Sequence, residues 1–317
     1  MSRTILTRLL QAVPVALGVS FITFILLNLL PGDTAEIIVG PGSTRQELNL
    51  VRSELGLNQP LIDRYLHWLG AALTGNLGRS IISGQSVTSM LSQRLPVTLE
   101  LVIGAFALAL LIAIPCAVLA ANHPHGLVDR LVSTVSILGL SLPGFVSGVL
   151  LILVFSVTLH LLPSEGFVPI TTRLGTNLRS MVLPVVTMSF ALFGIYAQML
   201  RASMQQQLRS EEYVVTATAK GISRARLLVA HVLRNSLVPL VSVIGVNFGT
   251  VIGATVLLES VFGLPGIGQL LVNSISSKDV TAVEGIVLVL ATIVILVNLL
   301  TDILYLFLDP RVRHGRN

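Results

Sequence analysis

The residues that could do chemistry are few in this sequence, and none of them completes a catalytic motif. The two lysines, Lys220 and Lys278, precede Gly221 and Asp279, so the chain has no Gly-x-x-x-x-Gly-Lys-Ser/Thr loop to hold the phosphates of ATP. No His-Glu-x-x-His motif is present, and no nucleophile is paired convincingly with a base. We therefore expect no catalytic residue in this chain, and no ATP hydrolysis by it.

Metal and disulfide chemistry are equally poorly supported. The single cysteine, Cys116, excludes a disulfide framework and a cysteine-rich zinc site, and we interpret it as a small apolar filler. His123 and His125 flank Pro124 at a short turn. Two imidazoles could bind a metal ion, but a solvated turn is the simpler interpretation. We expect no metal and no cofactor to be bound by this chain.

Composition explains why reactive groups are scarce. Of the 317 residues, 53% are hydrophobic and 11% are charged, and the mean hydropathy is +0.87. A soluble globular protein has about 25% charged residues. The net charge of +5 comes from sparse arginines, which suits orientation in a membrane better than binding to nucleic acid. The sequence therefore predicts an all-α integral membrane protein.

Six apolar runs are long enough to cross a bilayer, which takes roughly 20 residues. The predicted spans are residues 9–30, 100–121, 131–159, 182–200, 237–258 and 285–308. Buried helices of a soluble protein are a poor alternative, because six such runs could not all find a protein interior. The first run exceeds the roughly 7–15 apolar residues of a signal peptide, so we expect it to remain uncleaved.

The basic residues orient these spans. With residues 1–8 and 309–317 on the cytoplasmic side, the inner segments carry 12 arginines and lysines and the longer outer segments carry 8. We therefore expect both termini in the cytoplasm. The outer segments are then a large loop of residues 31–99, with helical spacing over 46–55 and 61–73, and a loop of residues 259–284. Tyr65 and Trp68 favour the membrane–water boundary, and the large loop is either a solvated cap or a docking surface.

The largest inner segment, residues 201–236, contains a pattern typical of two short helices. Glu211 and Glu212 lie where a helix N-terminus favours acidic residues, and Gly221 lies where that helix would end with a positive φ. A second short helix is predicted from Ser223 to Arg234. The pair is either a protein-docking element or a basic surface held by lipid headgroups.

Two further patterns concern helix packing and the outer surface. Gly245, Gly249 and Gly253 are spaced i, i+4, i+8, and either contact a partner chain or pack within this one. The glycines and proline of residues 259–279 discourage a continuous helix. We expect a re-entrant or surface segment there, with Phe262, Leu264 and Ile267 buried against neighbouring spans.

Several motifs, taken in order, resemble one protein family. They are Leu55-Gly56-Leu57-Asn58-Gln59-Pro60-Leu61, Ser141-Leu142-Pro143-Gly144-Phe145, Thr216-Ala217-Thr218-Ala219-Lys220-Gly221 with His231-Val232-Leu233-Arg234-Asn235, Val261-Phe262-Gly263-Leu264-Pro265-Gly266-Ile267-Gly268, and Leu308-Asp309-Pro310-Arg311-Val312-Arg313. This series is similar to the dipeptide/oligopeptide ABC importer permeases, the first permease of each pair. The resemblance covers almost the whole chain and implies the type I importer architecture.

The resemblance also implies partners and roles. The partners would be a second homologous permease, two cytoplasmic ABC ATPases that bind ATP and Mg, an extracytoplasmic substrate-binding protein, and a peptide as cargo. It marks an ATPase-coupling loop of Glu211, Glu212, Tyr213, Thr216, Ala217, Ala219, Lys220, Gly221 and Arg224. It further marks an outer gate or binding-protein contact of Phe262, Gly263, Pro265 and Gly266.

The coupling loop departs from the general importer pattern at two positions. The leading acidic residue of that pattern falls at Val215, and its closing proline falls at Arg234. These substitutions are similar to those of the peptide subfamily. Ala217 is expected to permit close approach to an ATPase groove, because its side chain is small.

The alternatives to peptide import are another cargo, an ion-coupled transporter and a channel. Similar permeases handle nickel, glutathione or haem, so these cargoes stay open. An ion-coupled transporter would place ionisable residues at mid-membrane, but Glu100 and Asp302 lie near span ends. A channel would fit the composition but would not explain the coupling-loop resemblance.

Overall fold

The computed structural model describes residues 2–29, 35, 39–40, 43–54 and 56–308. Across these residues the chain is helical, with one isolated bridge between Arg79 and Ser86 and no strand. The chain divides into two compact units. Unit 1 comprises Leu99–Leu264 and Leu300–Asn317, and unit 2 comprises Ser2–Thr98 and Pro265–Leu299.

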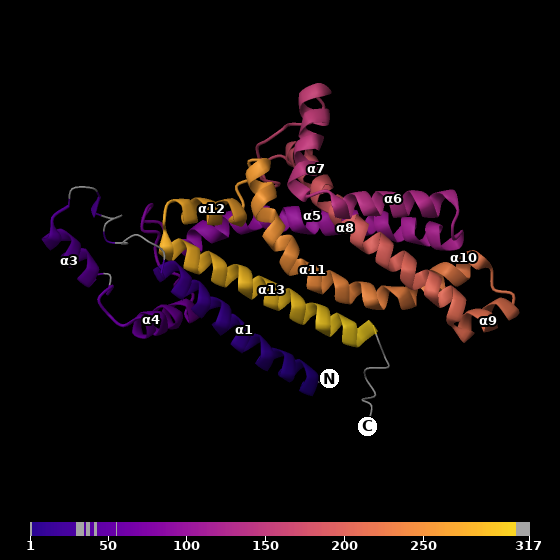
Figure 1. Cartoon of the computed structure of the whole chain (residues 1–317), viewed down its shortest axis with the longest axis horizontal. Helices are drawn as coiled ribbons and strands as arrows, with labels where there is room; N and C mark the ends of the chain where they lie inside the picture. Colours follow the sequence, from indigo (N-terminus) through magenta and orange to yellow (C-terminus); the bar gives the residue numbers. More distant parts are fainter. Residues whose placement is uncertain (1, 30–34, 36–38, 41–42, 55, 309–317) are drawn as a thin grey trace. The chain divides into compact units, whose positions relative to one another are not determined.

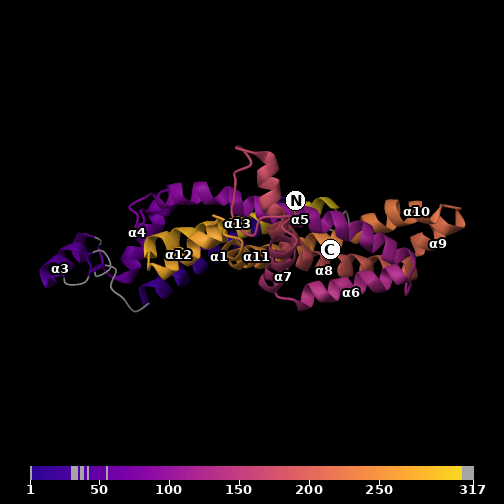
Figure 2. The same cartoon turned by 90° about the horizontal axis from the view of Figure 1, so that it is seen from above.

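Unit 1 is built around one long, largely buried helix. Its elements are α5 (Val87–Asn122) from Leu99 onward, α6 (Leu127–Ser141), α7 (Gly144–Leu151), the π-helical η1 (Ile152–Thr158), α8 (Leu174–Ser210), α9 (Glu212–Ala219), α10 (Arg224–Arg226), the π-helical η2 (Leu227–Val232), α11 (Leu233–Val261) and the end of α13 (Val280–Leu308). Helix α8 packs against α6, α7 and α11. Figures 1 and 2 show α6 lying alongside α8.

Two glycines allow α6 and α8 to approach closely. A Cβ on Gly139 of α6 would lie 2.7 Å from the carbonyl oxygen of Phe190, and a Cβ on Gly194 of α8 would lie 2.7 Å from that of Ser136. Real Cβ atoms do not come so close to a backbone oxygen. Small residues are the usual means by which helices in a membrane bring their backbones together. The two glycines therefore set the spacing of this pair.

The predicted third span, residues 131–159, is not one straight helix. It is a bent pair, α6 followed by α7 and η1, whose axes meet at 105° (Figure 1). Pro143 lacks a backbone N–H and begins α7, while Leu142 before it is extended, with φ −89° and ψ 124°. Proline imposes that conformation on the preceding residue, and the helix ends there.

Unit 2 has a small core and an aromatic cluster. It contains α1 (Ser2–Leu29), α3 (Arg45–Glu54), α4 (Leu61–Leu73), the first part of α5, α12 (Ile267–Ser276) and α13 as far as Leu299. The buried core consists of Leu77, Val87, Leu91, Ile267, Leu270, Ala282 and Ile286. On α4, the Tyr65 hydroxyl lies 2.8 Å from that of Ser20 on α1, and the Tyr65 ring packs edge-on against Phe24.

Five helices are long and apolar enough to cross a membrane, or six if the bent pair is one span; this holds for the described residues. The five are Leu10–Leu29, Val87–Asn122, Leu174–Ser210, Arg224–Val261 and Val280–Leu304. They cover the other predicted spans but several are longer: α5 starts 13 residues before residue 100, and α8 continues to Ser210. The predicted C-terminal segment 309–317, and residues 309–313 of its motif, lie outside the described residues, as does Leu55.

Candidate functional site

The loop between α8 and α11 contains a short helix that ends just before Gly221, as the sequence predicts. Helix α9 begins after Glu211, whose extended backbone caps it, and ends at Ala219. Gly221 follows with φ +74°, which confirms the predicted positive φ. Its N–H bonds to the Thr218 carbonyl at 3.0 Å, and the Ile222 N–H bonds to the Ala217 carbonyl at 3.2 Å. This pair of bonds is the Schellman motif that ends a helix at a left-handed residue.

The packing of α9 corrects the expected role of Ala217. Val214 and Ala217, three residues apart on one helix face, are buried with 8% of their surface exposed. Helix α9 packs against η2, which supplies the buried Leu227 and Leu228. Ala217 therefore faces the chain itself and offers no surface to an ATPase groove. Its small side chain allows α9 to pack closely against η2.

The opposite face of α9 is open and carries an apolar residue. Val215 is 71% exposed, and Thr216, Ala219 and Glu212 are exposed beside it. Val215 is the position at which the general importer pattern has an acidic residue. The sequence marked it only as a departure from that pattern. We call Val215, Thr216 and Ala219 the α9 outer face.

A chain of two hydrogen bonds joins α9 to the two long helices beside it. The Tyr213 hydroxyl donates to Gln207 Oε1 on α8 at 2.5 Å, and Gln207 Nε2 donates to the Ser236 hydroxyl on α11 at 2.8 Å. Ser236 is completely buried. Burial raises the pKa of the Tyr213 phenol; a hydrogen bond with Asn235 opposes the increase, and the charge of Glu211 adds to it. The phenol therefore remains a protonated donor at neutral pH.

The second short helix predicted in this loop is not separate. It begins at Arg224, close to the predicted Ser223, but continues through η2 into α11 as one helical run from Arg224 to Val261. At its start, Arg224 donates from Nε to Oδ1 of Asn122 at 2.9 Å and from Nη2 to the Asn122 carbonyl at 3.2 Å. Asn122 is the last residue of α5. The loop is thus tied directly to α5 and α11.

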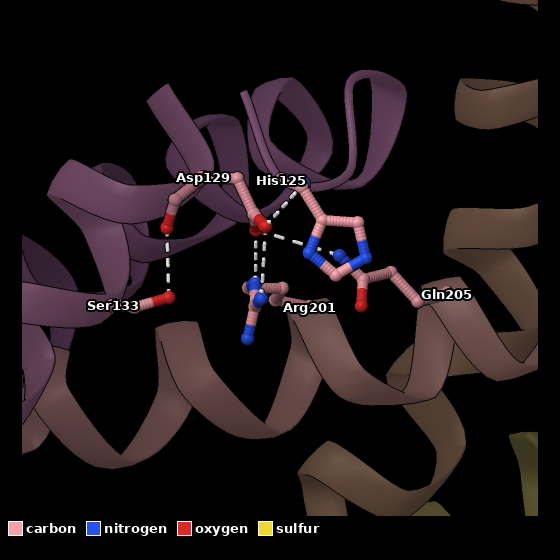
Figure 3. Close-up of polar contacts among 5 residues, drawn as sticks. All are labelled: His125, Asp129, Ser133, Arg201 and Gln205. Atoms are coloured by element: carbon pink, nitrogen blue, oxygen red, sulfur yellow. Dashed lines mark hydrogen bonds and ion pairs between the residues drawn. The ribbon is translucent and has the colours of Figure 1, made fainter. Parts of the chain in front are cut away.

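An ion pair that the sequence did not indicate fixes α6 to α8 near this loop (Figure 3). The guanidinium of Arg201 donates to both carboxylate oxygens of Asp129, from Nη2 at 3.0 Å and by a second, shorter bond from Nε. Asp129 also accepts from the backbone N–H of His125 at 2.8 Å and from the Gln205 side chain at 3.4 Å. Only 3% of the Asp129 side chain is exposed. Such a buried carboxylate requires these partners.

The glycines of the fifth predicted span do not behave alike. A Cβ on Gly245 would lie 2.6 Å from Cγ2 of Thr301 on α13, so Gly245 packs within this subunit. A Cβ on Gly253 would meet no atom within 4 Å, and Gly253 is exposed. Gly249 is half-buried between them. Gly245 therefore packs internally, whereas contact of Gly253 with another chain stays a prediction.

The segment after α11 breaks the helix as predicted, and it is largely buried. Gly263 has φ +60° and separates α11 from α12. Phe262, Leu264 and Ile267 are buried, which confirms that prediction. The Phe262 ring lies against Gly148 of α7, 3.2 Å from the position of a Cβ there. Gly266 is buried and Pro265 is half-buried. Gly263 is also half-buried, so part of this segment keeps an accessible surface, and its contact with a binding protein stays a prediction.

Comparison with known proteins gives matches over almost the whole chain. Residues 113–314 match the family described as binding-protein-dependent transport system inner membrane component, and residues 1–102 match its N-terminal companion. A probable peptide ABC transporter permease from Sinorhizobium fredii is 39% identical, over 98% of this chain and 99% of its own length.

Two further relatives match at similar length. A putative peptide transport system permease from Brucella abortus is 39% identical, over 99% of this chain and all of its own length. The glutathione transport system permease protein GsiC of an Escherichia coli strain is 36% identical, over 98% of both chains.

Proposed function

Because this chain belongs to the family of binding-protein-dependent transport system inner membrane components, we propose that it is a peptide-importing permease driven by partner ATPases. The cargo assignment is supported by two relatives named as peptide permeases, each matched over nearly its whole length. Di- and oligopeptides, delivered by an extracytoplasmic binding protein, are the proposed substrates. A second homologous permease completes the pore.

The observation that carries this proposal is the construction of α9. Its inner face is anchored by Val214 and Ala217, while its outer face exposes Val215. A short helix that packs against its own chain on one side and exposes the other can insert into a groove of a partner protein. The proposed occupant of the outer face is one cytoplasmic ATPase subunit. ATP and Mg are bound there, not by this chain.

The contacts around α9 suggest how ATPase closure moves the permease. Displacement of α9 reaches α8 and α11 through Tyr213, Gln207 and Ser236. It reaches α5 through Arg224 and Asn122, and α6 through the Asp129–Arg201 pair. Helices transmit displacement because their backbone hydrogen bonds resist bending. The helices would therefore move as rigid bodies between inward- and outward-facing states.

Glutathione is a second candidate cargo. The support is the 36% identity with a permease named for glutathione transport. The binding protein that delivers the cargo would decide between a simple peptide and glutathione.

The test is transport by the assembled complex in vesicles. The chain is reconstituted with its second permease, two ATPases and binding protein, and ATP-dependent uptake of labelled dialanine is measured. We expect both ATPases to copurify and unlabelled dialanine, rather than glutathione, to compete. Uptake of glutathione alone would transfer the assignment to the second candidate. Absence of any ATP-dependent uptake by a complex that has assembled would contradict the importer itself.

The proposed orientation places residues 1–8, α9 and the C-terminus in the cytoplasm and residues 31–99 outside. The support is the excess of arginine and lysine in the inner segments. A cysteine introduced at position 75 should react with a membrane-impermeant reagent from the outside. Reaction from the cytoplasmic side alone would reverse this orientation.

A further inference from the structure

Unit 2 contains a cavity, lined by both apolar and charged side chains, that the coupling mechanism does not use. The cavity has a volume of about 420 Å³, within the roughly 300–1,000 Å³ typical of small-molecule sites. Its walls include Phe24 of α1, Arg64 and Trp68 of α4, Arg79, and Glu284 of α13. The turn before α4, which carries part of the Leu-Gly-Leu-Asn-Gln-Pro-Leu motif, supplies Gln59. Part of that motif therefore forms one wall of the cavity.

Several groups in this cavity lack hydrogen-bond partners. Glu284 is 6% exposed, and no group among the described residues forms a hydrogen bond with its carboxylate. The indole Nε1 of Trp68 is buried and also has no acceptor in that part of the chain. Buried polar groups are rarely left without partners, since each costs free energy. The two groups indicate that something outside this chain completes the cavity.

The charges in the cavity are of both signs. The guanidinium of Arg64 lies over the Phe24 ring, 5.8 Å from its centroid, and Arg64 lines the same cavity as Glu284. Arg79 adds a second positive charge from an exposed position. Guanidinium groups bind carboxylates in a bidentate manner, and a buried carboxylate binds an ammonium group. A ligand that satisfies both must carry a carboxylate and an ammonium group a short distance apart.

We infer that this cavity binds the two charged ends of a short peptide, with Arg64 and Arg79 facing its carboxylate and Glu284 facing its ammonium group. The inference rests on the proposed function, because it gives the permease its own contact with the peptide cargo. In the proposed orientation the cavity is formed by the outer loop and the outer ends of α1 and α13. It would receive the peptide at the outer surface after the binding protein opens.

A single tryptophan makes this inference directly measurable. Trp68 is the only tryptophan of the chain and forms part of the cavity wall, so its fluorescence reports on this site alone. The full-length chain in phosphatidylcholine nanodiscs is titrated with dialanine. The comparison ligands are N-acetyl-dialanine, which lacks the ammonium group, and dialanine amide, which lacks the carboxylate. We expect a saturable change with dialanine and at least about a tenfold weaker affinity for either capped peptide.

Variants then assign the two ends. Glu284→Gln should weaken dialanine but leave the acetylated peptide unchanged, and Arg64→Gln should weaken dialanine but leave the amide unchanged. Arg79→Gln, at an exposed position, is a second carboxylate-end variant should Arg64→Gln fold poorly. Arg45→Gln on α3 removes an exposed arginine outside the cavity and should bind dialanine as wild type does.

Three results would overturn the inference. They are no change of Trp68 fluorescence with dialanine, equal affinity for the capped peptides, and a response to phosphatidylethanolamine in place of dialanine, which would make the cavity a lipid site. A loss of binding-protein-stimulated ATP hydrolysis in the variants, without dialanine binding to the wild type, would likewise assign the cavity to the binding protein. Uptake by the assembled complex is measured separately. If the complex imports dialanine but dialanine does not change the Trp68 fluorescence, this inference is removed and the proposed function stays in place.

Discussion

Asp129 on α6 and Arg201 on α8 are 72 residues apart in sequence, yet two hydrogen bonds join their side chains. The carboxylate is almost fully buried and the guanidinium is partly exposed. The pair therefore joins the first turn of α6 to α8, and the two helices pack against one another. Removing either partner leaves the other without its charge-assisted bonds, which makes the pair a test of how unit 1 is held together.

We expect Asp129→Asn and Arg201→Gln each to destabilise the chain by about 1.5–3 kcal/mol, the usual contribution of hydrogen bonds to charged groups. The double variant should lose clearly less than the sum, because neither charge is then left unpaired. Denaturant unfolding of the four proteins in detergent measures this coupling. Ser133→Ala, which removes a neighbouring hydroxyl but keeps the pair, is the control. Strict additivity would show that the pair contributes nothing.

Val215→Arg should release the ATPases without unfolding the permease. The side chain is 71% exposed, so a charge costs the isolated chain little, whereas it would have to be buried in a partner groove. Val215→Thr, of similar size and uncharged, should retain most of the association. Copurification of the ATPases and peptide uptake are measured beside membrane insertion. Full association of the arginine variant would remove the α9 outer face from the ATPase interface.

Gly221→Val should impair coupling more than Gly221→Asn. The backbone there has φ +74°, and no atom would hinder a Cβ, so the penalty is conformational. It amounts to about 1–2 kcal/mol for most residues, but asparagine visits this region readily. The readouts are uptake and ATP hydrolysis stimulated by the binding protein. Equal activity of the two variants would mean that the turn tolerates another backbone conformation.

Ala217→Glu should act by a different route from Val215→Arg. It forces a carboxylate into the contact between α9 and η2, so α9 itself should detach. Protease sensitivity of the loop in the isolated permease distinguishes detachment from loss of ATPase binding. We expect cleavage within α9 in Ala217→Glu and none in Val215→Arg. Resistance of both variants would contradict the inward orientation of Ala217.

Gly245→Ala and Gly253→Ala should separate internal packing from contact with a partner. The first places a methyl group within 2.6 Å of Thr301, and overpacking of this kind costs about 1–3 kcal/mol. The second enters open space, so the isolated chain should keep its stability. Stability of the chain alone and its association with the second permease are the two measurements. A stable Gly245→Ala chain would show that α11 and α13 can move apart.

Tyr213 gives a pH dependence with a definite sign. Burial raises its pKa, so the phenol favours the protonated form in the folded chain. Its contribution is complete below the unfolded pKa of about 10 and is lost as the pH rises through the higher folded value. Tyr213→Phe removes the bond to Gln207 at every pH, at a cost of about 0.5–1.5 kcal/mol. Difference absorbance of tyrosinate between the two proteins follows the titration; a midpoint at or below 10 would contradict the buried bond.

The sequence was informative where one physical signal dominated. Apolar runs bounded by charges predicted the long helices, because only such runs can cross a bilayer. Gly221 and Gly263 predicted helix breaks, and both adopt positive φ. The bend at Pro143 was missed because the apolar run continues through it, although the extended residue that a proline requires before it was a usable signal.

Contacts between distant residues were beyond such reasoning. No local pattern pairs Asp129 with Arg201, or directs Gln207 toward Tyr213 and Ser236. The sequence also provided no reliable indication of which face of α9 packs against the chain. Val214, Val215 and Ala217 are all apolar, so a helix of eight residues gives little indication of which face turns inward.

The bend at Leu142–Pro143 determines the parity of the chain. Counted as one crossing, the bent pair brings the number of spans to six and returns both termini to one side; counted as none, it leaves five and separates them. Every segment after it, α9 included, changes sides with that count.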